Sequence, residues 1–452
     1  MNNILRSEHT KSILKLGIPI MVGQLGVIIV GFVDNIMVGN YGTHELAAAS
    51  FVNGVINLAF VIALGYTYGL TPLVASSYAK GDGKLKTLLH SGTLANTIFG
   101  LLLTLIMAIL LIRVKMLGQP EELIPLIKPY FFIQLVSIIP VIIFNGYKQF
   151  VDGVGRTKVS MSAIIISNTV NILFNYLLIF GKFGFPELGL LGAGISTLLA
   201  RIVALLILLY KVHYTSSFSK VFEENRSTSG AIEKRILRKI THLGTPSAIQ
   251  MGFEAGSFSI AVILVGWIGS VELAAHQIIN TVGTLGFMMF YGMSAAVMIR
   301  IGYFYEARRT AEIRKIVHSG IILQVIMVVS LVITLILFRN HLGKIFTQDE
   351  EVLRITSILI LPLATYQLFD MLQILFSNVL RGIQDVKFTA RAAAFCYIVL
   401  TISVAYLFGF VFRWGVEGVW WSFPVGFSTL ATLLILRYRK VLKKMESQDI
   451  QR

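Results

Sequence analysis

The chain has 452 residues, of which 55% are hydrophobic and only 14% are charged, and its net charge is +16. A soluble domain is nearer half apolar and about a quarter charged, so this composition excludes a soluble globular fold and indicates an integral membrane protein. The single cysteine, Cys396, excludes an internal disulfide.

Twelve apolar stretches are each long enough to cross a bilayer as a helix, which takes roughly 20 residues. In the first half they cover residues 14–38, 46–77, 88–111, 124–147, 159–181 and 190–211. In the second half they cover residues 241–266, 273–299, 316–338, 353–379, 388–411 and 416–437. We therefore predict an all-α integral membrane protein with twelve transmembrane helices.

The positions of the basic residues predict which connections face the cytoplasm. Thirty of the 39 Lys and Arg residues lie in the N-terminal segment, the even-numbered connections and the C-terminal tail. Cytoplasmic connections carry such an excess, so we expect both termini in the cytoplasm and a multi-pass protein of the cytoplasmic (inner) membrane. The same distribution explains the net charge without nucleic-acid binding, and the basic run Arg437–Lys444 is interpreted as an anchor to anionic lipid headgroups.

The two halves of the chain are related in sequence. Residues 16–60 match residues 243–287 without a gap, and the pairs include Gly17 with Gly244 and Pro19 with Pro246. Six spans per half is an even number, so both halves enter the membrane in the same direction as parallel repeats. We predict an N-terminal six-helix bundle at 1–211, a cytoplasmic linker at 212–240, a C-terminal six-helix bundle at 241–437 and a basic cytoplasmic tail at 438–452.

Two smaller features accompany this division. The end of the linker, Ala231–Ile240, is interpreted as a surface amphipathic helix. Farther along each half, Gly189-x-x-Gly192 matches Gly415-x-x-Gly418 before the last span. No strand-to-helix context surrounds these glycines, so close helix packing and tight turns are favoured over phosphate binding.

Three acidic residues lie inside predicted spans: Asp34 in the first, Glu254 in the seventh and Asp370 in the tenth. The positions that correspond to Asp34 and Glu254 in the other repeat hold Ala261 and Val27, so these acids are not a by-product of the duplication. A charged carboxylate near the centre of a membrane helix costs ~2.5–3.5 kcal/mol. We expect such groups to face the bundle interior and bind a cation; the alternative is an inert, hydrogen-bonded carboxyl.

Neutral oxygen ligands accompany these acids. Tyr366 precedes Asp370 by one helical turn, and Gln250 precedes Glu254 by one turn. Phenol and amide oxygens complete sites for hard cations. We therefore predict that Glu254, Asp370, Tyr366 and Asp34 couple cation binding to function.

Other polar residues in the spans have weaker interpretations. Asn171 and Asn175 in the fifth span, with Thr197 in the sixth, form a candidate network of the N-terminal bundle or a set of helix–helix hydrogen bonds. Gln250 and Gln277 are candidate cavity residues, and His276, beside Gln277, is interpreted as an interfacial histidine. Arg201, inside the sixth span, is assigned no role.

The sequence contains no enzyme signature. Its eight histidines have no metal-ligand spacing, and it has neither a nucleophile elbow nor a Walker loop. We expect no cofactor, no structural metal and no ATPase subunit, so the energy source is an ion gradient of Na⁺ or H⁺.

The chain resembles the multidrug and toxic compound extrusion (MATE) transporters, in particular the NorM-like branch. The resemblance covers essentially the whole chain and rests on Pro19, the Val33–Gly39 stretch, the Gly42–Ala48 turn, the two-times-six layout and the three carboxylates. It implies a V-shaped pair of six-helix bundles and cation-coupled antiport. It also implies cation binding by Glu254, Asp370 and Tyr366, with Asp34, Asn171 and Asn175 in the N-terminal bundle.

The predicted function is therefore a cation-coupled antiporter that exports amphipathic, mostly cationic drugs and toxic compounds. Its partners are small organic cations and the lipid bilayer, and one chain already contains both bundles, which favours a monomer. The main alternative is a flippase for a lipid-linked saccharide, which only Arg201 supports. A major-facilitator transporter is disfavoured because Ala79–Lys84 poorly matches the conserved loop that such proteins carry after the second span. A membrane scaffold is disfavoured because it does not require three costly carboxylates inside its spans.

Overall fold

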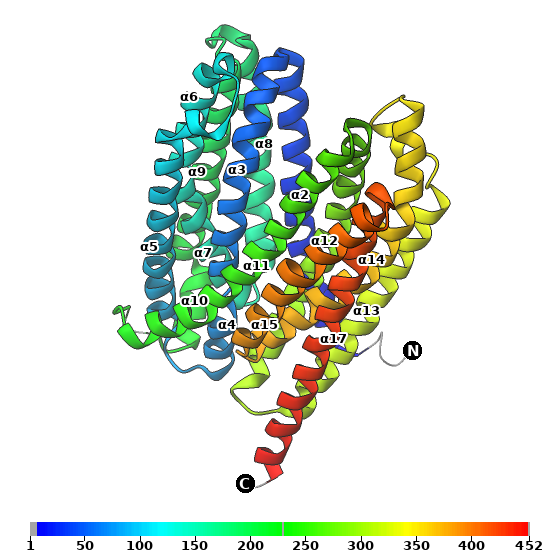
Figure 1. Cartoon of the computed structure of the whole chain (residues 1–452). Helices are drawn as coiled ribbons and strands as arrows, with labels where there is room; N and C mark the ends of the chain where they lie inside the picture. Colours follow the sequence, from blue (N-terminus) through cyan, green and yellow to red (C-terminus); the bar gives the residue numbers. More distant parts are fainter. Residues whose placement is uncertain (1–6, 228–229, 451–452) are drawn as a thin grey trace. The chain divides into compact units, whose positions relative to one another are not determined.

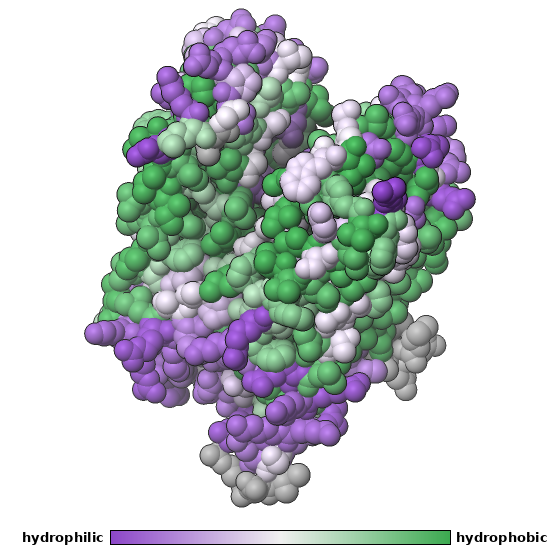
Figure 2. Space-filling model, viewed as in Figure 1, coloured by the Kyte–Doolittle hydropathy of each residue, from purple (hydrophilic) through white to green (hydrophobic). Residues whose placement is uncertain are grey.

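The computed structural model describes residues 7–227 and 230–450, which form helices joined by short turns and contain no β-strand (Figure 1). Twelve helical segments in this part of the chain are long and apolar enough to span a membrane. Each overlaps a predicted span, and the last runs well beyond its predicted end at 437, to Gln448, so the predicted all-α class and the twelve spans are confirmed. Figure 2 shows hydrophobic residues over the middle of the helices and hydrophilic ones at their ends.

The first half of the chain supplies six spans. They are α2 (Glu8–Tyr41), α3 with α4 (Thr43–Thr67 and Thr71–Lys80), α5 (Leu85–Ile112), α6 with α7 (Ile124–Val136 and Ile138–Gly153), α8 (Thr157–Phe180) and α9 (Leu190–Tyr214). Within this half α8 packs against α9, and α7 packs against both α5 and α9.

The second half repeats this order. It contains α11 (Lys234–Ile268), α12 (Ser270–Tyr305), α13 (Thr310–Leu337), α14 (Glu350–Gly382), α15 (Val386–Ala393) and α17 (Gly415–Ile450). Between α15 and α17 the eleventh span continues through the π-helical segments η5 (Ala394–Thr401) and η6 (Leu407–Val411), joined by α16 (Ile402–Tyr406). Helix α14 packs against α12 and α17. Segments of π-helix are rare and frequently occur at functional sites.

The chain forms two compact units whose limits lie inside two helices. Unit 1 contains residues 1–21 and 249–452, and unit 2 contains residues 22–248. The first turns of α2 therefore belong with the second half, and those of α11 with the first half. Each limit falls just after a proline inside the helix, Pro19 in α2 and Pro246 in α11, where the backbone lacks a hydrogen-bond donor and helices kink. The predicted domain limits at 211 and 240 stay a prediction.

Contacts within unit 1 bring the beginning of α2 together with the end of α17. His9 contacts Glu312 at 2.7 Å between Nε2 and Oε2, and Arg314 forms an ion pair with Glu446. The N-terminal turns of α2 and the C-terminal turns of α17 thus lie at one end of this unit (Figure 1). This arrangement requires an even number of spans between them.

The linker contains a helix that sequence analysis placed wrongly. Helix α10 (Ser216–Glu224) lies before the expected segment, and residues 234–240 belong to α11 instead. Phe218 and Val221 of α10 are buried, and Asn225 donates to the Ser77 carbonyl at 2.9 Å. The linker therefore docks on unit 2 rather than lying free on the membrane surface.

The repeated glycine pairs form equivalent turns. Gly189 and Gly415 have φ of 54° and 59°, a left-handed conformation that favours glycine. A Cβ on Gly192 would lie 2.5 Å from the Leu178 carbonyl oxygen, and one on Gly418 would lie 2.6 Å from the Phe408 carbonyl carbon. Each pair therefore brings a helix directly against the preceding span, which confirms the packing interpretation.

Candidate functional site

The candidate site in unit 1 is a buried pair of carboxyl groups from two helices. Glu254 of α11 is 7% exposed and Asp370 of α14 is 0% exposed. Gln373, one turn after Asp370, donates its amide Nε2 to Glu254 Oε1 at 3.3 Å and to Asp370 Oδ1 at 3.2 Å. The amide group joins two acidic residues that are more than a hundred positions apart in the chain.

Two tyrosines border this pair. Tyr366 lies beside Asp370, and Tyr397, from the π-helical segment η5, lies beside Glu254. By distance and angle, neither the buried Tyr397 hydroxyl nor Asp370 Oδ2 forms a hydrogen bond, although Tyr397 is close enough to Glu254, and Tyr366 to Asp370, to interact with these carboxyl groups. Buried polar atoms in proteins are nearly always paired, so these two oxygens mark a place for water or a cation.

Aromatic rings pack around Tyr366 beside this polar centre. Its ring meets Phe427 at 4.8 Å between centroids, edge to face, and Phe423 at 5.9 Å. Phe258 stacks on Phe423 at 4.7 Å. Charges held in such a water-poor interior interact more strongly than charges in water.

A chain of hydrogen bonds extends from the carboxyl pair along α14. Gln250 donates to Ser377 at 3.0 Å, and Ser377 donates to Gln373 Oε1 at 3.4 Å. The buried guanidinium of Arg381 donates to Gln250 Oε1 at 3.3 Å and to Asn378 Oδ1 at 3.0 Å. The predicted cavity residue Gln250 is thus linked to the site.

The other predicted cavity residue, Gln277, is exposed on α12, and no hydrogen bond among the described residues joins it to this chain. Its neighbour His276 is fully buried and packs against Trp420 at 5.4 Å between ring centroids. The last span thus covers His276 with an indole ring, and its position at the membrane interface stays a prediction.

The donor atoms of this site suit a hard cation. Two carboxyl groups, two phenol oxygens and an amide lie together, and oxygen ligands of these kinds are preferred by Na⁺-like ions and accept protons. Over residues 7–227 and 230–450, no three His, Cys, Asp or Glu side chains gather as a transition-metal site requires. The arrangement can hold a small cation whose charge offsets the repulsion between the two carboxylates.

Unit 2 contains a separate polar network around Asp34 of α2. Asn175 of α8 donates to Asp34 Oδ1 at 2.5 Å and to Asn171 Oδ1 at 3.2 Å. Asn171 in turn donates to Thr197 Oγ1 at 3.4 Å. The structure brings together all four residues that the sequence placed in this network, and their role in cation coupling stays a prediction.

Arg201 of α9 lies in a second polar chain of unit 2. Its guanidinium donates to Gln134 Oε1 at 3.0 Å and to the Ser137 hydroxyl, and it lies 4.4 Å above the Phe60 ring. Gln134 donates to Tyr130, which donates to Asn53. Arg201 also interacts electrostatically with Asp34, without a direct ion pair. Unit 2 therefore holds an acid and a permanent cation, whereas the centre of the site in unit 1 is acidic.

Sequence reasoning missed Gln373 and Tyr397 in unit 1 and Tyr130 and Gln134 in unit 2. Gln373 was detectable, because it lies one turn from Asp370 and two turns from Tyr366 on the same helical face. Tyr397 was not detectable, because its orientation depends on a π-helical segment that no sequence pattern predicts.

Comparison with known proteins defines the family. The sequence model of the family described as MatE matches residues 19–177 and 246–407, which is more than half of the chain and includes a copy in each repeat. The chain therefore belongs to the MatE family, and the resemblance to MATE transporters is confirmed.

Solved structures share this fold over nearly the whole chain. The eukaryotic MATE transporter AtDTX14 superposes with a TM-score of 0.87 at 20% identity, covering 98% of this chain and 99% of that one. An outward-facing multidrug resistance MATE family transporter of the MOP superfamily has a TM-score of 0.84 at 21% identity, with 98% of both chains covered. A MOP superfamily transporter from Pyrococcus furiosus, described as having a binding pocket of reverse polarity, has a TM-score of 0.82 at 22% identity, with 98% of both covered.

Proposed function

We propose that this protein is an antiporter of the cytoplasmic membrane that exports amphipathic, mostly cationic organic compounds in exchange for Na⁺ or H⁺. The observation that carries the proposal is the buried pair of Glu254 and Asp370, bridged by Gln373 and bordered by two unpartnered oxygen atoms. Family membership supports a transporter, and the acidic centre supports cation coupling. The NorM-like branch is favoured because the acidic pair lies in the C-terminal repeat.

In the proposed cycle, a cation enters from outside and binds between Glu254 and Asp370. Its charge removes the repulsion between the carboxylates and lowers the negative potential that attracts an organic cation. The substrate then leaves to the outside, and release of the coupling ion to the cytoplasm restores the acidic pair. A membrane potential supplies about 2.3 kcal/mol per net charge moved for each 100 mV, so it drives the export of a neutral compound, or of a monovalent cation that is exchanged for at least two coupling ions.

Efflux from proteoliposomes tests the proposal. A fluorescent lipophilic cation is loaded, and Na⁺ and pH gradients are imposed one at a time. We expect one of the gradients to drive efflux and thereby to identify the coupling ion. Absence of driven efflux under both gradients, with folded protein, would contradict antiport.

The alternative of a lipid-linked saccharide flippase draws support from Arg201, whose half-buried guanidinium suits a phosphate. It requires a basic cavity, whereas the acidic pair in unit 1 suits cations. If gradient-driven drug efflux fails, translocation of a lipid pyrophosphate that depends on Arg201 becomes the next measurement.

A further inference from the structure

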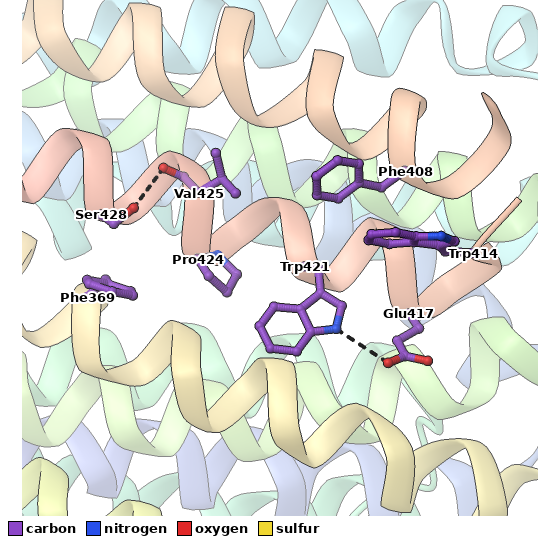
Figure 3. Close-up of a pocket in the computed structure, with 8 residues that line it drawn as sticks. All are labelled: Phe369, Phe408, Trp414, Glu417, Trp421, Pro424, Val425 and Ser428. Carbon is purple, nitrogen blue, oxygen red and sulfur yellow. Dashed lines mark hydrogen bonds between the residues drawn. The ribbon is translucent and has the colours of Figure 1, made fainter. Parts of the chain in front are cut away.

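A pocket of unit 1 lies between α14, η6 and α17, and neither Glu254 nor Asp370 lines it (Figure 3). Its volume is about 710 Å³, within the range of small-molecule sites. Four of its lining residues are aromatic, Phe369, Phe408, Trp414 and Trp421, and Glu417 is its one acidic lining residue. These side chains have no part in the proposed coupling mechanism.

The aromatic residues reach the pocket through local features of the fold. Glu417 and Trp421 are four residues apart and share one face of the start of α17, and Trp414 lies just before that helix. Gly418 allows α17 to approach η6, and the Trp414 amide donates to the Phe408 carbonyl at 3.0 Å. As a result the rings of Phe408 and Trp414 lie 4.8 Å apart at an angle of 41°.

The pocket is charged at one end. Figure 3 shows the Trp421 indole nitrogen directed at Glu417, and the indole N–H donates to Glu417 Oε1 at 3.4 Å. Phe369 and Ser428 lie at the opposite end of the pocket (Figure 3). Among the ion pairs of residues 7–227 and 230–450, none involves Glu417. Its carboxylate therefore lacks a basic partner from the protein and faces aromatic rings.

This set of side chains is absent from the other repeat. With Gly415 aligned to Gly189, the positions of Trp414, Glu417 and Trp421 correspond to Leu188, Leu191 and Ile195. The first repeat forms the same helical turn although it lacks these aromatic and acidic residues. The pocket's chemistry is therefore specific to the second repeat and is not needed to build the hairpin.

We propose that this pocket binds the ammonium group of an amphipathic organic cation, with the rings of Trp414 and Trp421 around the cation and Glu417 as its counter-ion. Aromatic faces within about 6 Å attract quaternary ammonium groups, and the carboxylate adds a full opposite charge. Phe369 and Val425 supply an apolar wall for the body of the ligand. The ligand class is that of the proposed function, but the site is distinct from the coupling pair and its occupancy needs no transport.

Equilibrium dialysis with the full chain in nanodiscs tests the pocket. The probe is radiolabelled benzyltriethylammonium, and its comparison compound is the uncharged isostere in which carbon replaces nitrogen. Binding to empty nanodiscs is subtracted. We expect the ammonium compound to bind at least about tenfold more tightly than its isostere, since only the cation gains from the rings and from Glu417.

Variants locate this binding. Glu417→Gln keeps the shape of the side chain and should weaken ammonium binding about tenfold, and Trp421→Ala should weaken it by at least as much. Trp421→Phe keeps a ring face and should stay within about threefold of wild type. The matched controls are Trp267→Ala, which changes a tryptophan that is 66% exposed on α11, and Glu272→Gln, which changes an acidic residue in the first turn of α12.

Choline headgroups of lipids and free organic cations both carry an ammonium group that could occupy the pocket. Varying the lipid composition of the nanodiscs distinguishes these two ligands. If phosphatidylcholine discs lower probe binding relative to phosphatidylglycerol discs, a lipid headgroup competes for the pocket. Equal binding in both identifies a site for free cations, and either result supports the proposal.

Equal binding of the ammonium compound and its isostere, or unchanged binding by Glu417→Gln and Trp421→Ala, overturns the proposal. Trp414 and Trp421 would then be interfacial anchors of the kind common at membrane surfaces. Because no gradient is applied, failure here leaves the antiport test unaffected.

Discussion

At the scale of single residues, Gln373 holds the coupling site together because one amide nitrogen bonds to both carboxyl groups. Replacing it with leucine, Gln373→Leu, keeps the volume and removes the donor. We expect gradient-driven efflux to fall by about tenfold or more, since the two carboxylates lose the group that sets their separation. The measurement is the initial efflux rate from proteoliposomes under the working gradient.

A matched variant separates this effect from general destabilisation. Gln324 of α13 is also buried, and its Nε2 donates to Ser294 at 2.5 Å without touching a carboxylate. Gln324→Leu should lower the melting temperature to a similar extent while coupling is retained. Equal loss of driven efflux in both variants would show that Gln373 acts only through stability.

Arg201 allows a second prediction at this scale. Arg201→Met removes the guanidinium that lies over the Phe60 ring and leaves Gln134 Oε1 and Ser137 without their donor. Leaving such buried groups unpaired costs about 1–3 kcal/mol, so the melting temperature should fall. Arg339→Met, at an exposed position beyond α13, is the control and should leave it unchanged. If both variants melt as wild type does, the polar chain of Arg201 contributes no stability.

The sequence identified the acidic residues of the site but not their complete surroundings. Glu254, Asp370 and Asp34 stood out because carboxylates are rare and costly in apolar spans. Asn171, Asn175 and Thr197 were found from helical spacing, and the structure joins them by hydrogen bonds. Sequence alone did not show that His276 is buried while its neighbour Gln277 is exposed, because the neighbouring helices determine which face of α12 is covered.

At the scale of elements, the turn between α3 and α4 lies so close to α11 that only glycine fits at the contact. A Cβ on Gly69 would lie 2.5 Å from the Gly244 nitrogen, and one on Gly244 would lie 2.5 Å from the Tyr66 carbonyl oxygen. Because both obstacles are backbone atoms, the helices themselves must move apart. Gly69→Ala and Gly244→Ala should each destabilise the protein by about 1–3 kcal/mol, measured as a lower melting temperature in detergent.

The same helices provide matched controls. At Gly54 of α3 and Gly256 of α11, no atom lies within 4 Å of the place that a Cβ would occupy. Gly54→Ala and Gly256→Ala should be neutral or stabilise by up to about 1 kcal/mol, since alanine favours the helix. If all four variants melt alike, the crossing is looser than these distances indicate.

The twelve spans were predictable because each is a long, mostly apolar run; their ends, and the breaks between α3 and α4 and between α6 and α7, were not. Helix α10 was missed because it is short and its burial depends on docking to unit 2. The π-helical segments η5 and η6 leave no periodic signal, although they carry Tyr397 and Phe408. Local pattern thus predicts where helices exist, and tertiary packing determines how their backbones are wound.

At the scale of the whole molecule, the distribution of basic residues predicts that both termini are cytoplasmic. The buried Cys396 is the single cysteine, so a Cys396→Ala background allows labelling at chosen positions. In intact cells a membrane-impermeant maleimide should label Ile345→Cys, at a position that is 77% exposed before α14, and leave Ser447→Cys in the tail unlabelled. Labelling of the tail in intact cells would show that the orientation is opposite to the predicted one.

Cation coupling by Glu254 and Asp370 is most directly tested by running the exchange backwards. A drug gradient imposed across proteoliposomes should drive the coupling cation uphill, followed with tracer Na⁺ or an internal pH dye. We predict uphill cation movement in wild type and in the control Glu272→Gln, and none in Glu254→Gln or Asp370→Asn, although these variants remain folded. Uphill movement that persists in both carboxyl variants would contradict the account.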